Sequence, residues 1–238
     1  MNRNLKLILG SVYILCLGLI VYYVFSYLDF KDLSNYSFIK DKSSILINFK
    51  ENNLLLFLFF FFFFIILWIM LLGFASPIAI VAGFIFGPWY GTLISVFSFS
   101  VGCTLLYTLA QLYFKEPINK FLGSKIENFK FLFNKNELLY FMIFRFIGGA
   151  GIPFPMQNIL PVLFNMKIKN YFYASFFGLF PVVFILCSLG SGIENYIENN
   201  TDLNYLSILL DPGIYNPIFG FLCILITSYF LKAKLFKK

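Results

Sequence analysis

The sequence predicts an all-α polytopic membrane protein, with transmembrane helices and two re-entrant half-helix hairpins arranged as an inverted repeat. Hydrophobic residues make up 60% of the chain and charged residues 12%, and the mean hydropathy is +0.84, which is outside the range of a soluble domain. In addition, two of the apolar stretches are interrupted by Gly and Pro, which end helices before they can span a bilayer. The bilayer is therefore expected to act as the solvent of this chain.

Residues 1–53 are predicted to form an N-terminal signal-anchor helix followed by a polar loop. Arg3 and Lys6 precede an apolar run from Leu7 to about Phe25, which is longer than a signal-peptide core and lacks a small-residue cleavage site. Positive residues before a span favour a cytoplasmic N-terminus. The polar stretch Asp29 to Asn53 would then lie on the far side of the membrane.

Residues 54–190 are predicted to form the membrane core, which begins with a full crossing from Leu54 to Leu72. The composition then changes, because the next stretch contains Gly and Pro and reads GFASPIAIVAGFIFGPWYG. Pro77 suits the first turn of a helix, where its missing N–H costs little. A helix running from there to about Phe86 would cover only about 15 Å, at 1.5 Å per residue.

Gly87, Pro88 and Gly91 end this half-helix. We therefore expect the chain to turn near mid-depth and to continue as a helix from Thr92 to Phe114, which is a re-entrant hairpin. Irregular backbone at that depth is tolerated only where protein covers it or where it faces a wet cavity, so the break marks a candidate pocket.

A second interrupted segment, LLYFMIFRFIGGAGIPFPMQNILPVLF, follows the amphiphilic stretch Lys115 to Glu137, which we expect at a membrane interface. Its helix breakers are Gly148, Gly149, Gly151, Pro153, Pro155 and Pro161. They predict a second hairpin. Pro77 and Phe86-Gly87 recur as Pro155 and Phe164-Asn165 at the same separation, which indicates an internal duplication.

After a further span from Tyr171 to Gly190, residues 191–238 are predicted to form an acidic loop, a final transmembrane helix and a basic cytoplasmic tail. The helix covers Ile214 to Leu231. The loop carries Glu194, Glu198, Asp202 and Asp211, and the tail carries Lys232, Lys234, Lys237 and Lys238. Loop charges alone give four full crossings with both termini inside and both hairpins open to the cytoplasm.

Arg145 is the most informative residue, because it lies just before the Gly-rich break, where a charge is costly to hold in a membrane. One reading is structural: the side chain reaches the headgroup region or bonds carbonyls freed by the broken helix. The other reading is functional, since a planar guanidinium can bind phosphate oxygens bidentately. We favour an anionic headgroup as its partner.

Asn158 follows the Pro153-Phe154-Pro155 turn. It could bond a headgroup, cap the following half-helix or satisfy an unwound carbonyl, and Gln157 is a weaker candidate of the same kind. Four glycines have a spacing that lets helices approach closely, and packing is their expected role. They are Gly83, Gly87, Gly91 and Gly102.

Composition also argues against several other functions. The formal charge of +7 comes from lysines in loops and tails, so no nucleic-acid partner is expected. The chain has no His, and its four cysteines lie in apolar stretches without metal-ligand spacing, so we expect no metal or other cofactor. No nucleophile–base pair, acidic dyad or phosphate loop is present, and we expect the protein not to be an enzyme.

The order of GFIFGPWYG in the first broken segment, then FRF, IPFPMQN and GLFP in the second, resembles the DedA superfamily, and more narrowly the VTT-domain proteins once called SNARE-associated Golgi proteins. The similarity covers about Leu54 to Gly190. It implies two re-entrant hairpins that face each other across the bilayer, and movement of phospholipids or polyprenyl-phosphate lipids between leaflets. It also implies scramblase-type transport that supports envelope or membrane homeostasis.

Carried over by position, the resemblance implies that Arg145, Pro153, Phe154, Asn158, Gly178 and Pro181 belong to the lipid path. Pro155 and the first-hairpin residues Gly87, Pro88 and Gly91 complete the candidate site. This chain departs from the family in two places: Gly73 to Gly91 contains no acidic residue, and Gly148 and Gly149 stand where relatives commonly have Pro. Coupling of transport to protons through the first hairpin is therefore in doubt, and the second turn is expected to be looser.

Three functions are kept open. The first is a membrane lipid transporter or scramblase that binds anionic headgroups. The second is an ion-coupled transporter of a small anion, which would also suit one intramembrane arginine and two half-helix N-termini. The third is a non-catalytic membrane organiser. The expected location is the bacterial inner (plasma) membrane, with multiple passes, and a homo-oligomer is left open.

Overall fold

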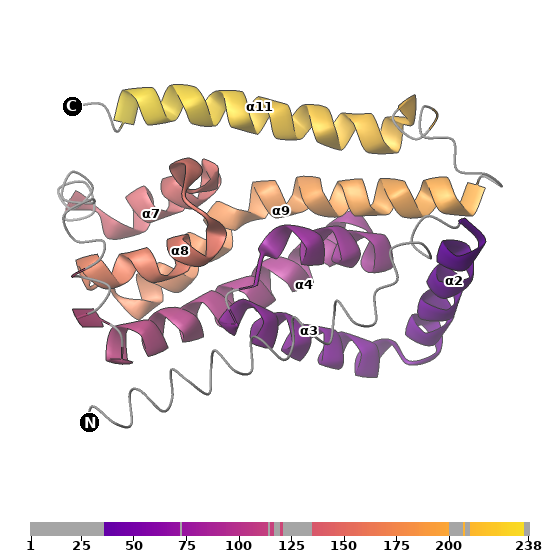
Figure 1. Ribbon diagram of the computed structural model, residues 1–238, viewed down its shortest axis with the longest axis horizontal. Helices are drawn as coiled ribbons and strands as arrows, with labels where there is room; N and C mark the ends of the chain where they lie inside the picture. The colour runs from indigo at the N-terminus through magenta and orange to yellow at the C-terminus, as the bar shows by residue number, and fades with distance from the viewer. Residues whose placement is uncertain are drawn as a thin grey trace. The chain divides into compact units, whose positions relative to one another are not determined.

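The computed structural model describes residues 36–71, 73–113, 115–116, 120, 135–199, 207 and 210–235, and this part of the chain is helical and contains no strand (Figure 1). The predicted signal anchor from Leu7 to Phe25 and most of the stretch from Lys115 to Glu137 lie outside these residues. The elements are α2 (Tyr36–Asn52), α3 (Leu54–Met70), α4 (Ala75–Tyr113), α7 (Glu137–Phe146), η3 (Gly148–Gly151), α8 (Phe154–Ile159), η4 (Leu160–Phe164), α9 (Ile168–Asn199) and α11 (Pro212–Leu235).

The chain divides into two compact units, Met1–Leu54 and Leu55–Lys238. The described part of the first unit is α2, a 17-residue helix. The sequence predicted a polar loop from Asp29 to Asn53, and this prediction is wrong over Tyr36–Asn52, which forms α2. The α2 sequence contains no Gly or Pro, so nothing in it prevents a continuous ladder of backbone hydrogen bonds.

Two described helices, α4 and α9, are long and apolar enough to cross a membrane, and a third span exists if Ser44–Asn52 and Leu54–Met70 count as one. The predicted helix from Ile214 to Leu231 lies entirely within α11, which has 24 residues and whose apolar stretch is Pro212–Thr227. The predicted crossing from Leu54 to Leu72 corresponds to α3, which has 17 residues and ends at Met70.

The first hairpin lies within α4, which is interrupted at Gly87 (φ 76°, ψ 177°). Such backbone angles are accessible almost only to glycine. A Cβ added to Gly91 would lie 2.7 Å from the carbonyl oxygen of Ala82, although residues nine apart in a straight helix are separated by about 13 Å. The two arms therefore fold back on each other, and the predicted half-helix that ends at Phe86 is confirmed.

The second hairpin is built from η3, α8 and η4, and it ends at Asn165, a left-handed residue (φ 50°, ψ 43°). Pro153 caps α8, and Pro155 occupies its first turn. The helix changes from α to 3₁₀ geometry at Leu160, next to Pro161, which has no N–H to donate to the carbonyl four residues back. The predicted second half-helix, stopped at Phe164-Asn165, is thus confirmed.

The long arms of the two hairpins run antiparallel. Tyr107 of α4 stacks on Tyr171 of α9 with ring centroids 4.5 Å apart. Near the other ends of these arms, Trp89 lies 4.7 Å from Phe184. Because a step toward the start of α4 is a step toward the end of α9, the two hairpins are related by inversion, as the duplication predicted.

The same close contacts occur in both halves. Gly102 in the first half and Gly178 in the second are positions where an added Cβ would collide with the preceding helix. The first faces Ile66 and Ile69 of α3, and the second faces Met142 and Arg145 of α7. The three residues of the second half each lie 76 positions after their counterparts in the first half. The pairs are Ile66 and Met142, Ile69 and Arg145, and Gly102 and Gly178. The packing role predicted for Gly102 is confirmed.

Each half-helix also packs on the long arm of the other hairpin. An added Cβ on Gly83 would lie 1.9 Å from the carbonyl oxygen of Cys187 in α9. In the second half, Cys103 of α4 donates to Oδ1 of Asn158 at 3.2 Å. This exchange of half-helices joins the two repeats into one core.

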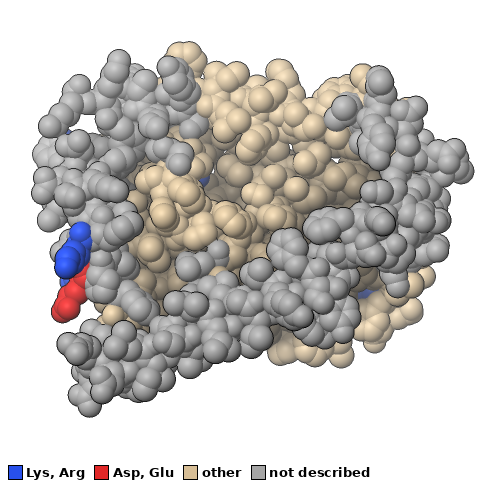
Figure 2. All heavy atoms as spheres, viewed as in Figure 1, with Lys and Arg blue, Asp and Glu red and all other residues tan. Residues whose placement is uncertain are grey.

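Helix α9 continues to Asn199, so Glu194 and Glu198 belong to a helix, and the predicted acidic loop does not begin at residue 191. Helix α11 packs beside α9 (Figure 1), most closely where an added Cβ on Gly192 would lie 2.0 Å from the carbonyl oxygen of Gly213. The described residues visible in Figure 2 are almost all uncharged, as expected of a surface that faces hydrocarbon.

Candidate functional site

Arg145 lies in the last turn of α7 and is completely buried, with 0% of its surface exposed. Gly178 of α9 makes this position possible, because an added Cβ there would lie 2.6 Å from the Arg145 Cβ. Only a glycine on α9 lets α7 approach so closely. The guanidinium is thereby held between α7, α9 and the second half-helix.

Three neutral side chains accept hydrogen bonds from the guanidinium. Nη2 donates to Oδ1 of Asn158 at 2.7 Å and to the Tyr171 hydroxyl at 2.9 Å, and Nη1 approaches Oε1 of Gln157 at 3.5 Å. The Tyr171 hydroxyl in turn donates to the backbone carbonyl of Asn158 at 3.1 Å. These bonds tie α9 and the second half-helix to one cation.

Aromatic rings enclose the same cation. The Arg145 Cζ lies 4.8 Å from the ring centroid of Phe141, 5.4 Å from that of Phe154 and 5.8 Å from that of Tyr171. Ring faces carry partial negative charge and attract a guanidinium at these distances. They stabilise the charge partially but do not neutralise it.

Among the residues that the structure describes, no carboxylate forms an ion pair with Arg145. Glu137, the acidic residue of α7, instead accepts hydrogen bonds from Asn170 Nδ2 at 2.6 Å and from the Lys167 backbone N–H at 3.2 Å. Two buried donors of the cluster, Nε of Arg145 and Nδ2 of Asn158, have no acceptor among the described residues. A buried positive charge beside hydrogen-bond donors that lack acceptors is complementary to an anion.

The Gly-rich turn before the second half-helix is braced by Gln157. Its Nε2 donates to the carbonyl of Ile152 at 2.7 Å and to that of Gly148 at 3.2 Å. Gly148 and Gly149 both have positive φ, 66° and 72°, and an added Cβ on Gly149 would lie 2.2 Å from Gln157. The turn is therefore tightly closed, in contrast to the looser turn expected from the sequence.

The predicted site residues fall into two groups. Those that contact or directly position the Arg145 cluster are Pro153, Phe154, Pro155, Asn158 and Gly178. The others are Gly87, Pro88 and Gly91 at the first hairpin, and Pro181, which lies inside α9 one turn after Gly178. Pro88 lines a separate pocket with Ser188, which follows Tyr171 by 17 residues, or about 25 Å of helix.

The sequence did not single out Tyr171 and Cys103, and it ranked Gln157 low. Asn158 lies inside α8 and accepts from Arg145, so it does not cap that helix, and its bond to a headgroup stays a prediction. A signal for such partners does exist, because an arginine buried in a membrane segment needs several acceptors. That requirement predicts that polar residues in neighbouring spans should converge on Arg145, but it does not say which ones.

Within the described ranges, no three His, Cys, Asp or Glu side chains are grouped so that they could hold a metal ion. The polar contacts of the cluster are made by amide, hydroxyl, thiol and guanidinium groups. This set can bind and orient an anion through hydrogen bonds.

Comparison of the sequence with known proteins finds one family and a relative. The VTT domain matches residues 74–192, which span both hairpins and the Arg145 cluster. The protein "Transmembrane protein 41 homolog" of Caenorhabditis elegans is 25% identical over 181 residues, which cover 73% of this chain and 72% of the relative. No solved structure matches the chain.

Proposed function

The chain belongs to the VTT domain family, and on that premise we propose that it moves phosphate-bearing lipids between the two leaflets of a membrane. The observation that carries the proposal is the buried Arg145, whose charge no described carboxylate neutralises and whose Nε has no acceptor. A charge in a membrane segment is costly, and charges kept there despite that cost mark functional sites. A lipid phosphate would supply the missing negative charge.

The hydrogen bonds of the cluster suggest how a headgroup would enter. Asn158 and Gln157, both on the second half-helix, hold the guanidinium through neutral acceptors. Phosphate oxygens form charge-assisted hydrogen bonds, which are roughly twice as strong as neutral ones. A phosphate can therefore displace these side chains and move the half-helix away from α7 and α9.

The inverted repeat supports movement in both directions. The long arms are antiparallel, and in transporters built from inverted repeats this relation allows one central site to open to either side of the membrane. Polar groups of the second half-helix then provide partners for a headgroup at a depth where water is absent. The proposed process needs no covalent chemistry.

The lipids proposed as partners are anionic phospholipids and polyprenyl phosphates. The proposed location in a bacterium is the inner membrane, because α-helical spans occur there whereas outer-membrane spans are β-barrels. In this setting the transport would support envelope homeostasis.

The test is leaflet exchange in liposomes that contain the purified protein. Fluorescent phosphatidylglycerol and a polyprenyl phosphate are compared in vesicles with wild-type protein, with Arg145→Ala and without protein. We expect wild-type protein to accelerate exchange of at least one lipid and Arg145→Ala to slow it at least about tenfold, the effect of losing one charged hydrogen bond. Exchange of both lipids at the empty-vesicle rate would refute the proposal.

Two other functions have distinct outcomes in the same assay. The idle donors of Arg145 and Asn158 would also suit a small oxyanion. An anion transporter would take up radiolabelled phosphate and leave lipid exchange unchanged. A membrane organiser would retain its cellular function after Arg145→Ala, and neither lipid nor phosphate movement would respond to the substitution.

A further inference from the structure

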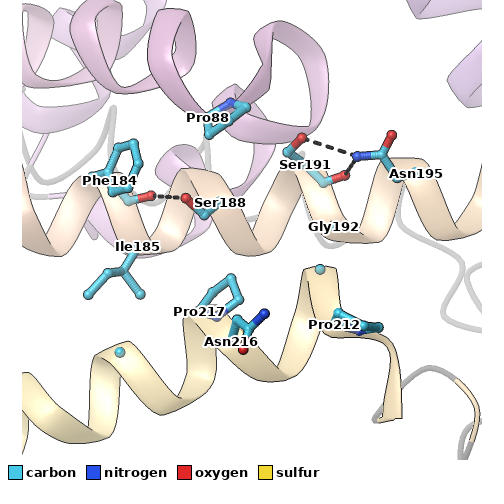
Figure 3. A pocket seen from close by; sticks show the side chains of 12 residues that line it. Pro88, Phe184, Ile185, Ser188, Ser191, Gly192, Asn195, Pro212, Asn216 and Pro217 are labelled. Atoms are coloured by element: carbon cyan, nitrogen blue, oxygen red, sulfur yellow. Dashed lines mark hydrogen bonds between the residues drawn. The ribbon is translucent and has the colours of Figure 1, made fainter.

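A pocket of about 410 Å³ lies between α9 and α11, beside the turn of the first hairpin. Its volume falls within the range of about 300–1,000 Å³ that is typical of small-molecule sites. Figure 3 shows Asn216 and Pro217 rising from α11 toward α9, with Pro88 on the opposite side of α9. The lining residues are Pro88, Phe184, Ile185, Ser188, Ser191, Gly192, Asn195, Pro212, Gly213, Asn216, Pro217 and Gly220.

The two ends of this pocket differ in chemistry. One end is formed by Phe184 and Ile185 of α9 together with Gly220 of α11. The Ser188 hydroxyl, in between, is engaged with the carbonyl of Phe184 at 2.8 Å, so it adds little polarity. This end is therefore suited to a hydrocarbon chain.

The other end presents donors and acceptors. Asn195 donates to the Ser191 carbonyl at 2.9 Å, which leaves its Oδ1 as an acceptor that faces no described donor. Asn216 is exposed, and its amide forms no hydrogen bond within the part of the chain that the structure describes. An amide is both donor and acceptor, which matches a hydroxyl or an ester.

The pocket lining contains no charged side chain, unlike the Arg145 cluster. Asp211, the residue before α11, accepts from the Gly213 backbone N–H at 2.8 Å and so lies next to the polar end. A phosphate placed there would find no cation in the described lining to balance it and would face a like charge. The polar end therefore favours an uncharged headgroup.

The helix contacts leave the apolar end open to the membrane. Helices α9 and α11 touch closely at Gly192 and Gly213, where an added Cβ would be only 2.0 Å from backbone. At Gly220 the corresponding distance to Ile185 is 3.5 Å. The neighbouring α11 residues Phe219 and Leu222 are exposed and apolar, as expected where lipid chains surround a helix.

We propose that this pocket binds a neutral hydroxyl-bearing lipid of the diacylglycerol class. One acyl chain lies along Phe184, Ile185 and Gly220, and the hydroxyl and ester groups bond Asn195 and Asn216. The proposal does not depend on the function proposed for Arg145, because the two sites use different residues and opposite headgroup chemistry.

The experiment uses the full-length protein in nanodiscs with photoactivatable diacylglycerol or photoactivatable phosphatidylglycerol of identical chains. Crosslinked peptides are mapped by mass spectrometry. At equal mole fraction we expect diacylglycerol to label peptides of α9 and α11 about fivefold more than phosphatidylglycerol, the ratio that one neutral hydrogen bond supports. Equal labelling by the two lipids would indicate contact with surrounding lipid only and would overturn the proposal.

Two tryptophan variants test the location. Gly220→Trp fills the apolar end and should lower diacylglycerol labelling about fivefold, as expected when one hydrocarbon contact site is blocked. Thr227→Trp is the matched control, because it places the same side chain on the same face of α11 two turns away, outside the pocket. Unchanged labelling in correctly folded Gly220→Trp would overturn the proposal.

Asn216→Leu provides the second variant, should Gly220→Trp fail to fold. Asn216 is exposed and its amide holds no other described residue, so its replacement leaves packing intact. We expect this variant to label equally with the two lipids. A preference for diacylglycerol that survives Asn216→Leu would contradict the role assigned to the polar end.

Discussion

The two halves of the core place the same backbone around very different side chains. Ile69 of α3 and Arg145 of α7 each pack against a glycine of the following long helix, 76 positions apart along the chain. Both side chains are completely buried. At corresponding positions, the first half therefore has a hydrocarbon side chain and the second half has a cation.

The difference extends to the partners of the cation. The half-helices are offset by 78 residues, as Pro77 and Pro155 show, so Gln157 and Asn158 correspond to Ala79 and Ile80. Tyr171, offset by 76, corresponds to Ser95. Apart from the buried Ser95 hydroxyl, the first half packs with apolar side chains at these positions, so the repeated backbone arrangement forms without a cation or amide groups. The comparison therefore supports the functional role proposed for the Arg145 cluster.

The largest loss of stability is expected from a substitution that breaks the contact between a half-helix and the long arm of the other hairpin, which occurs in both halves. In Gly190→Val, the new Cβ would lie 1.9 Å from the carbonyl oxygen of Ile80, and the backbone cannot move away within a packed core. We expect a loss of more than about 3 kcal/mol in unfolding free energy, measured by denaturant unfolding in detergent micelles.

Gly220→Ala is the control, because its Cβ would meet the nearest side chain at an ordinary 3.5 Å. It should change stability by less than about 1 kcal/mol. Gly190→Val unfolding with the wild-type midpoint would show that α9 and the first half-helix do not touch as described.

A smaller effect comes from making the first half resemble the second. Ile69→Arg would bury a cation where the corresponding half-helix offers Ala79 and Ile80 in place of amide acceptors. We expect destabilisation of about 3 kcal/mol, the cost of a charge at the centre of a membrane helix. Ile69→Met, which conserves volume, should cost less than about 1.5 kcal/mol. Equal unfolding midpoints for the two variants would contradict the comparison.

Much of this fold follows from local sequence. The breaks at Gly87 and Asn165, and the half-helices that Pro77 and Pro155 begin, are set by backbone chemistry that individual residues reveal. The partners of Arg145 could not be predicted in the same way, because Tyr171 and Cys103 come from other helices. Their role depends on contacts between elements, and either residue alone is typical of a membrane span.

Errors occurred where local signals were weak. The polar residues of α2 were expected to form a loop, although polar residues do not prevent a helix. Helix α9 runs nine residues past Gly190 to Asn199, because that glycine serves close packing against Ile80 and does not end the helix.

The smallest loss of stability is expected when one hydroxyl is removed from the second half, which holds the Arg145 cluster. Tyr171→Phe keeps the stacking on Tyr107 but removes the acceptor for Arg145 Nη2 and the donor to the Asn158 carbonyl. We expect a loss of about 1–2 kcal/mol in unfolding free energy. Tyr173→Phe, on the exposed face of the same helix, should have no effect. Equal midpoints for the two variants would show that the Tyr171 hydroxyl does not hold the cluster.

The most direct test of the central claim measures stability and transport together in Arg145→Met, which replaces the buried cation with an apolar side chain of similar length. If the cluster is kept for function, removal of a costly buried charge should offset the loss of its hydrogen bonds to Gln157, Asn158 and Tyr171, and unfolding free energy should change by less than about 2 kcal/mol. Leaflet exchange of phosphate lipids should fall at least about tenfold. A variant that loses stability yet, where folded, exchanges lipid at the wild-type rate would contradict the account, because Arg145 would then be a structural residue.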